Sequence, residues 1–137
     1  NRVTRGIYVS SPTKPKILIV DADIEDSTNA AMVLGELYDT CILDSGKKCL
    51  EQVLDINPDL ILLEAILPGI DGFETCTDLK NDSSTNHIPV ILVSSLDDDI
   101  VEEELSSVAA DDYIHKPLDT DRLVEAVDTL LSFRQAE

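Results

Sequence analysis

The chain has 137 residues, of which 43% are hydrophobic, and it carries 28 acidic against 10 basic side chains for a formal net charge of −18. This length suits one domain with its own core, and the acidic balance argues against nucleic acid or an anionic membrane surface as a partner. The three cysteines show no metal-ligand spacing and no apolar run reaches the roughly 18 residues of a membrane span, so we expect a cytoplasmic location.

Residues 1–15 are expected to form a leader or linker. They mix serine, threonine and basic residues with Pro12 and Pro15, and the two prolines discourage regular structure. A folded domain is expected over residues 16–133, and residues 134–137 are expected to form a C-terminal tail.

Apolar patterning in the folded part predicts alternating strands and helices. Unbroken apolar runs predict buried parallel strands at residues 17–20, 60–63 and 90–93, with weaker strands at 41–43 and 113–114. Apolar residues at helical spacing between the strands predict helices. The stripes are Ala30, Val33, Leu34 and Leu37, then Cys49, Leu50, Val53 and Leu54, and finally Leu123, Val124, Val127, Leu130 and Leu131. Two further helices are expected at 72–80 and 98–109, and Asp119 or Thr120 is expected to cap the last helix.

Strand and helix therefore alternate five times along the chain. Right-handed crossovers between parallel strands place helices on both faces of one sheet. The expected fold class is α/β, a flavodoxin-like (βα)5 doubly wound parallel sheet with strand order 2-1-3-4-5. In such a sheet the working site lies at the carboxyl ends of the first, third and fourth strands.

A distinctive set of residues, most of them polar, collects at these predicted carboxyl ends. The residues are Asp21, Ala22 and Asp23 after the first strand, Glu64 at the third, Ser94 and Ser95 at the fourth, and Lys116 after the fifth. Carboxylates bind a hard cation, whereas a lysine and a hydroxyl bind phosphate oxygens. Their joint placement on four strands indicates phosphoryl or metal chemistry.

Residues 58–72, with the sequence PDLILLEAILPGIDG, closely resemble the central motif of the response-regulator receiver domains of two-component signalling. The resemblance covers roughly residues 16–133. It implies that Asp21 is the first acid of the family's acidic pair and that Ala22 falls where the second acid binds magnesium directly. It also implies that Glu64 falls on the aspartate that takes a phosphoryl group from a histidine kinase.

The same resemblance assigns the remaining residues of the pocket. It implies that Ser94 is the switch hydroxyl that binds the phosphoryl group and that Lys116 is the family's lysine. Tyr113 matches the aromatic residue that rotates inward on activation, so Ser94 and Tyr113 form the expected switch. The full pocket that the resemblance implies is Asp21, Ala22, Glu64, Ser94 and Lys116.

Two residues depart from the family's pattern, and both affect the same chemistry. Ala22 removes a direct magnesium ligand, which leaves Asp21, Glu64 and a backbone carbonyl near Ile66 for an ion that requires near-octahedral oxygen geometry. Glu64 adds one methylene, about 1.5 Å of reach, and an attacking group displaced by about 1 Å can lose about 10²-fold in rate. Asp23 stays open either as a replacement ligand or as an acid that only supports a helix start.

The leading hypothesis is an atypical receiver, a pseudo-receiver that acts through protein contacts without phosphorylation. Glu64 either holds an active-like arrangement permanently or is a tolerated acid in a decayed site. On this hypothesis the chain is not an enzyme, has no catalytic residue and uses no metal or other cofactor. The alternative is a functional receiver that takes phosphate from a histidine kinase with magnesium. A flavin or nucleotide site is rejected because the acids after the first strand would repel phosphate.

The expected partners are signalling proteins, or covalently linked output or kinase domains of a larger chain. Lys116 is expected within ion-pairing distance of Glu64, because it is the base of the pocket that can offset the like charges of Asp21 and Glu64. A homodimer through the helix at 98–109, the strand at 113–114 and the last helix is expected to be weak or absent. Acids crowd that face, and an isologous contact pairs a patch with itself.

Overall fold

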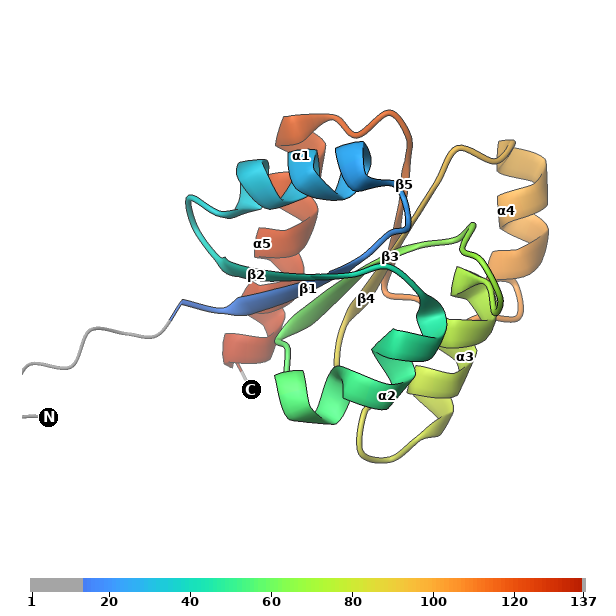
Figure 1. Cartoon of the computed structure of the whole chain (residues 1–137), viewed down its shortest axis with the longest axis horizontal. Coiled ribbons are helices and arrows are strands. Elements are labelled where there is room, and N and C mark those ends of the chain that lie inside the picture. Colours follow the sequence, from blue (N-terminus) through green and yellow to red (C-terminus); the bar gives the residue numbers. More distant parts are fainter. Residues whose placement is uncertain (1–13, 137) are drawn as a thin grey trace, which may run out of the picture.

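The computed structural model of the protein describes residues 14–136, in which strands and helices alternate (Figure 1). The strands are β1 (Lys16–Val20), β2 (Asp39–Leu43), β3 (Leu60–Glu64), β4 (Val90–Ser94) and β5 (Asp112–His115). The helices are α1 (Ile24–Leu34), α2 (Gly46–Ile56), α3 (Gly72–Asn81), α4 (Asp98–Leu105) and α5 (Thr120–Ala136). The described strands pair in parallel in the order β2-β1-β3-β4-β5, which confirms the predicted doubly wound sheet.

The central strands β1, β3 and β4 are buried on both faces, as their unbroken apolar runs predict. Successive side chains of a strand point to opposite faces, so Ile17 and Ile19 pack under α1 and α5 while Leu18 and Val20 pack under α2 and α3. Figure 1 shows the same division, with α1 and α5 on one face of the sheet and α2 and α3 on the other. Each fully buried Ile or Leu contributes about 1.5–3 kcal/mol of transfer free energy.

Side-chain caps fix where several helices begin, and these starts lie at the carboxyl edge of the sheet. The capping oxygens belong to Asp23 of α1, Ser45 of α2, Asp71 of α3 and Asp119 of α5, and they accept amide protons at 2.9, 3.1, 2.8 and 2.8 Å respectively. Such a bond satisfies an amide that has no partner inside the helix. Of the two caps considered for the last helix, Asp119 is therefore the one that the structure shows.

Helix α4 is shorter than predicted, ending at Leu105 and not near residue 109. Its last turn carries Glu102, Glu103 and Glu104, and negative side chains are unfavourable at the negative end of a helix dipole. Ser106 and Ser107 then donate their hydroxyls to the carbonyls of Glu103 and Glu104 at 2.7 and 3.1 Å. These local bonds compete with continuation of the helix.

Two leucines of the predicted apolar helical stripes are exposed. Leu37 lies beyond the end of α1 and is 55% exposed, and Tyr38 packs into the core instead. Leu54 is on α2 but is 61% exposed, because Val53 occupies the buried position on that turn. The apolar spacing was correct for the helices but extended each stripe by one residue too far.

The domain limits can be compared with the structure only in part. Most of the leader expected over residues 1–15 lies outside the described residues. Helix α5 continues to Ala136, beyond the expected domain end at residue 133. Within residues 14–136, every helix is too short or too polar to cross a bilayer.

Candidate functional site

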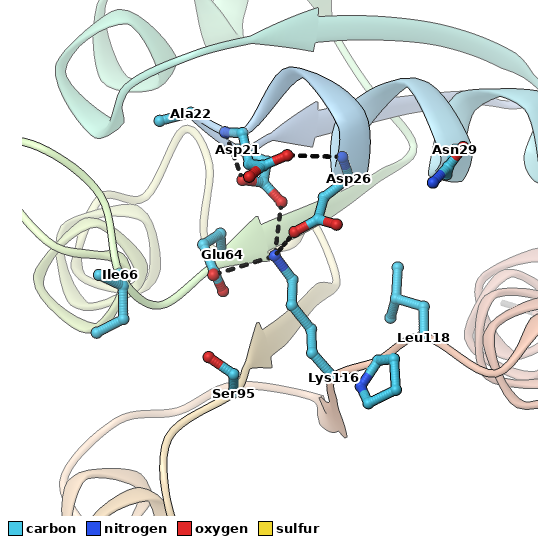
Figure 2. Close-up of a pocket in the computed structure, with 11 residues that line it drawn as sticks. Asp21, Ala22, Asp26, Asn29, Glu64, Ile66, Ser95, Lys116 and Leu118 are labelled. Carbon is cyan, nitrogen blue, oxygen red and sulfur yellow. Dashed lines mark hydrogen bonds and ion pairs between the residues drawn. The ribbon is translucent and has the colours of Figure 1, made fainter.

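A cavity of about 810 Å³ opens at the carboxyl edge of the sheet, where β1, β3 and β5 end (Figure 2). The residues that line it are Asp21, Ala22, Asp23, Asp26, Asn29, Glu64, Ile66, Ser95, Lys116, Pro117 and Leu118. They meet because parallel strands bring their carboxyl ends to one edge of a sheet. The cavity therefore lies where the fold predicts a working site.

Lys116 lies among the acids of this cavity. It follows β5, and its peptide bond to the next residue, a proline, is cis. Its Nζ donates to Oδ2 of Asp26 at 2.8 Å, to Oδ2 of Asp21 at 3.0 Å and to Oε1 of Glu64 at 3.1 Å, as Figure 2 shows. The expected ion pair between Lys116 and Glu64 is thus confirmed. An ammonium group has three N–H donors, so the three carboxylates use all of them.

The charge on Lys116 is stabilised by these contacts. Its side chain is only 12% exposed, and burial on its own would lower the pKa of Lys116. The hydrogen bonds to Asp26, Asp21 and Glu64 outweigh burial, so the pKa of Lys116 is raised above its ordinary value of 10.5. The ammonium therefore remains protonated at neutral pH.

Glu64 ends β3 and is 8% exposed. Its Oε1 accepts from Lys116, and its Oε2 accepts the backbone amide of Ala65 at 2.9 Å. Burial raises the pKa of Glu64 above the ordinary 4.5. Lys116 lowers this pKa by less than burial raises it, and its ammonium also donates to Asp21 and Asp26. Glu64 is thus a carboxylate held in place at both oxygens.

Gly72, at the start of α3, allows the chain to pass close to Glu64. Its amide donates to the carbonyl of Ala65 at 2.7 Å, and a Cβ at this position would collide with the carbonyl oxygen of Glu64. A glycine is needed for this close approach. The loop after β3 therefore packs directly on the strand end that carries Glu64.

Asp21 and Asp23 connect the end of β1 to the start of α1. Oδ1 of Asp21 accepts the amide of Asp23 at 3.0 Å, and Oδ1 of Asp23 accepts the amide of Asp26 at 2.9 Å. Asp23 is therefore a helix cap. The sequence left two roles open for Asp23, a replacement metal ligand or an acid that supports a helix start, and the cap agrees with the second.

The donor set of the cavity does not fit a magnesium ion. Ala22 presents an exposed methyl group where the family resemblance implies a carboxylate ligand. One oxygen each of Asp21, Asp26 and Glu64 is bonded to Lys116, and the second oxygens of Asp21 and Glu64 accept backbone amides. Across residues 14–136, no three His, Cys, Asp or Glu side chains are grouped so that they could hold a metal ion. Magnesium requires six oxygens in near-octahedral geometry, and these side chains do not offer that set.

The two serines at the end of β4 lie differently from the sequence expectation. Ser94 is fully buried, its Oγ accepts the amide of Leu96 at 2.9 Å, and among the described residues it does not belong to those that line the cavity. Ser95, the next residue, lines the cavity and is exposed. Ser95 thus contributes to the lining of the cavity, whereas Ser94 is buried at the end of β4.

Tyr113 of β5 lies inward. Its hydroxyl donates to the carbonyl of Ser94 at 3.2 Å, and its ring packs against the core under α2 and α3. Burial, followed by the charges of Asp98 and Glu64, raises the pKa of the Tyr113 hydroxyl above 10.0. The hydroxyl of Tyr113 thus lies at the strand end that carries Ser94.

Of the residues predicted for the pocket, the structure brings together Asp21, Ala22, Glu64 and Lys116, whereas Ser94 lies beside them. Sequence reasoning missed Asp26, although it makes the shortest contact with Lys116. The available signal was the cap at Asp23: a cap places the residue three positions later on the first turn, at the helix end that faces the cavity.

Comparisons with known proteins agree with this geometry. The model of the family described as the response regulator receiver domain matches residues 17–128. Response regulator PleD of Caulobacter vibrioides is 36% identical over 121 residues, which cover 87% of this chain and 26% of PleD. DNA-binding response regulator MtrA of Mycobacterium tuberculosis H37Rv is 34% identical over 115 residues, which cover 83% of this chain and 49% of MtrA. The chain thus spans half or less of the length of these relatives.

Solved structures are similar over nearly their whole length. The signal receiver domain of a signal transduction histidine kinase from Syntrophus aciditrophicus has a TM-score of 0.82 and 31% identity, with 86% of this chain and 90% of that chain covered. The BeF3-activated N-terminal receiver domain of RstA from Klebsiella pneumoniae has a TM-score of 0.76 and 33% identity, with 85% and 97% covered.

Proposed function

This chain belongs to the response regulator receiver domain family, and from that premise we propose that it is an atypical receiver that signals through protein contacts without accepting a phosphoryl group. The proposal concerns the residue at the phosphoacceptor position and the ion that the transfer needs. It assigns the domain no catalysis of its own and no bound cofactor.

The observation that carries the proposal is the state of Glu64. Both of its oxygens are engaged, one by the Lys116 ammonium and one by the Ala65 amide. An attacking carboxylate oxygen must approach phosphorus in line, and the added methylene of Glu64 moves that oxygen by about 1.5 Å. The exposed methyl group of Ala22 supplies no ligand for the metal that would neutralise the phosphoryl group.

The position of Tyr113 supports an active-like arrangement. The family resemblance implies that this aromatic residue rotates inward on activation. Here its hydroxyl donates a hydrogen bond to the carbonyl of Ser94. Glu64 places one negative charge beside Lys116, where a phosphoryl group would place about −1.5 to −2. The charge of Glu64 and the inward ring together favour a domain that holds its signalling surface without a chemical trigger.

The partners that fit this proposal are linked domains or separate signalling proteins. The similar proteins include a DNA-binding response regulator and a receiver domain of a histidine kinase. Output and kinase domains are therefore both candidates for the protein that reads the surface of this one.

Acetyl phosphate with magnesium tests the proposal, with intact mass as the readout. The wild-type chain is expected to remain unmodified, whereas the double variant Ala22→Asp with Glu64→Asp serves as the positive control that takes up phosphate. A magnesium-dependent covalent adduct on Glu64 of the wild-type chain would overturn the proposal.

A functional, phosphoryl-accepting receiver is the second candidate. The retained Asp21 and Lys116, together with an acid at position 64, favour it. The same experiment separates the two, because this candidate requires the adduct.

A further inference from the structure

A second hollow of the surface lies between the start of α2 and the loop that follows β3. Its volume is about 650 Å³, and it shares no lining residue with the cavity that holds Lys116. Its lining includes Ser45, Lys47, Leu50 and Glu51 from the α2 side and Pro68 and Ile70 from the loop. The last two and Leu50 give it an apolar centre, and we call this hollow the α2 groove.

Close packing between α2 and the loop fixes the shape of the α2 groove. A Cβ on Gly46, the first residue of α2, would collide with Oγ1 of Thr75 and lie 3.0 Å from Cγ1 of Ile70. The glycine therefore allows α2 to contact α3 and the loop directly. Oγ1 of Thr75 in turn donates to the carbonyl of Asp71 at 2.8 Å, at the end of the loop. The groove is thus already formed in the chain on its own.

Leu54 extends the apolar surface of the groove along α2. Residues three or four positions apart share a helix face, so a single stripe of α2 contains Lys47, Leu50, Glu51 and Leu54. The stripe covers two helical turns, a length of about 10 Å. Leu54 is 61% exposed although its side chain is large and apolar. The groove and the stripe together suit an extended or helical segment of a protein better than one small molecule.

The charges at the start of α2 differ from those of the chain as a whole. The chain carries a net charge of −18, but the first turn of α2 has no acid and contains Lys47 and Lys48. Lys48 pairs with Asp44 at 2.9 Å, whereas Lys47 is exposed and makes no ion pair with another residue of the described part of the chain. The positive end of the helix dipole adds to the charge of Lys47. A carboxylate of a partner is therefore favoured at this end of the groove and disfavoured one turn further along, beside Glu51.

We propose that the α2 groove binds a segment of a partner protein that places apolar side chains on Leu50 and Leu54 and a single carboxylate on Lys47. The inference rests on the protein contacts in the proposed function, for which it names a surface, and not on the chemistry of Glu64. The net charge of the chain opposes both a second copy and an anionic membrane as the occupant.

Two synthetic peptides of equal length test the inference. Each carries two leucines spaced four apart, and one has a glutamate at the end where the other has a glutamine. In NMR spectra of the wild-type chain at physiological salt, both peptides at millimolar concentration are expected to shift the amides of Leu50 and Ile70 saturably. The glutamate peptide is expected to bind about threefold more tightly, the scale of an exposed ion pair. Lys47→Gln is expected to remove this difference.

Two exposed leucines provide matched variants. Leu54→Asp is expected to weaken both peptides at least about tenfold, because it removes apolar area from the stripe. Leu37→Asp is the control, since Leu37 is 55% exposed but lies beyond the end of α1, outside the groove. It should leave both affinities at the wild-type level.

The inference is overturned if neither peptide shifts Leu50 and Ile70, or if the two peptides bind the wild type equally. It is also overturned if Lys47→Gln keeps their difference, or if Leu54→Asp and Leu37→Asp weaken binding equally. A shift of the same amides with the concentration of the chain alone would make a second copy the occupant and contradict the inference as well.

Failure of this inference is distinguishable from failure of the proposed function. A covalent adduct on Glu64 after treatment with acetyl phosphate would remove the proposed function whatever the peptides do. A chain that stays unmodified and binds neither peptide would lose only the α2 groove as its contact surface.

Discussion

Glu64 and Ala22 stand at the ends of neighbouring strands, and the proposed function rests on both of them. On that proposal, Glu64 alters where a nucleophilic oxygen would lie, and Ala22 alters what could hold a metal beside it. The strand-end acids could be located from the sequence, because buried runs identify the strands and a parallel sheet aligns their ends. The contact of Asp26 with Lys116 was not predicted, because it depends on how the first turn of α1 is oriented toward the cavity.

The two departures can be separated by restoring them one at a time. Glu64→Asp alone is expected to remain poorly phosphorylated by acetyl phosphate, because the ligand at position 22 is still missing. Ala22→Asp combined with Glu64→Asp is expected to react at least about 10-fold faster, because the carboxylate at position 22 restores a metal ligand and loss of support to a metal site typically costs about 10–100-fold. Rates from intact mass decide between them. Equal rates in the single and double variants would show that Ala22 is not the critical loss.

The burial of Glu64 predicts a pH dependence of stability. A carboxyl group whose pKa is raised in the folded protein binds more protons when folded, so its contribution is present below the unfolded pKa and is lost as pH rises through the folded pKa. The wild type is therefore expected to lose stability relative to Glu64→Gln as pH rises from below 4.5 through the raised pKa of Glu64. Urea unfolding across this range measures the difference. Glu51→Gln, an exposed change on α2, controls for the substitution itself, and a wild type that instead gains stability over Glu64→Gln would contradict the assignment.

The helices show which local signals are reliable in this chain. The apolar runs located the strands to within a few residues, and the pair Asp119 and Thr120 located the start of α5, since both signals depend on chemistry within a few residues. The end of α4 and the exposure of Leu37 and Leu54 were not predicted. Apolar spacing takes no account of a run of glutamates, and it does not show how much of a helix surface the sheet covers.

The cap of α5 can be tested by comparing two adjacent residues. Asp119→Ala removes the acceptor for the Arg122 amide and is expected to lower the free energy of unfolding by about 1 kcal/mol. Thr120→Ala, beside it, is expected to change it by less than about 0.5 kcal/mol, as exposed substitutions usually do. Denaturant unfolding of both variants gives the comparison. A larger loss of unfolding free energy for Thr120→Ala than for Asp119→Ala would show that Asp119 is not the cap.

At the scale of the whole molecule, α4 and the residue before it concentrate exposed negative charge. Asp97, Asp98 and Asp99 precede or begin α4, three glutamates end it, and all six are exposed. The two bases that follow them in the chain are already engaged, Lys116 inside the cavity and Arg122 with Asp112 at 3.1 Å. The structure thus adds a reason for the expected weak self-association that the sequence alone did not contain.

Sedimentation at low and high salt measures this self-association. The isolated chain is expected to be monomeric at low salt, because a two-fold axis on the face formed by α4, β5 and α5 would oppose acid to acid. Any association should strengthen with salt, which screens the repulsion. A tight dimer at low salt that is buried through this face would contradict the expectation.

The most direct measurement of the central claim is the amide NMR spectrum with and without beryllofluoride and magnesium. Beryllofluoride mimics a phosphoryl group, so a receiver that responds to phosphate shifts its switch residues when the mimic binds. The account predicts that Ser94 and Tyr113 of the wild-type chain do not shift, whereas they do in the double variant Ala22→Asp with Glu64→Asp. A saturable, magnesium-dependent shift at Ser94 and Tyr113 of the wild-type chain would contradict it.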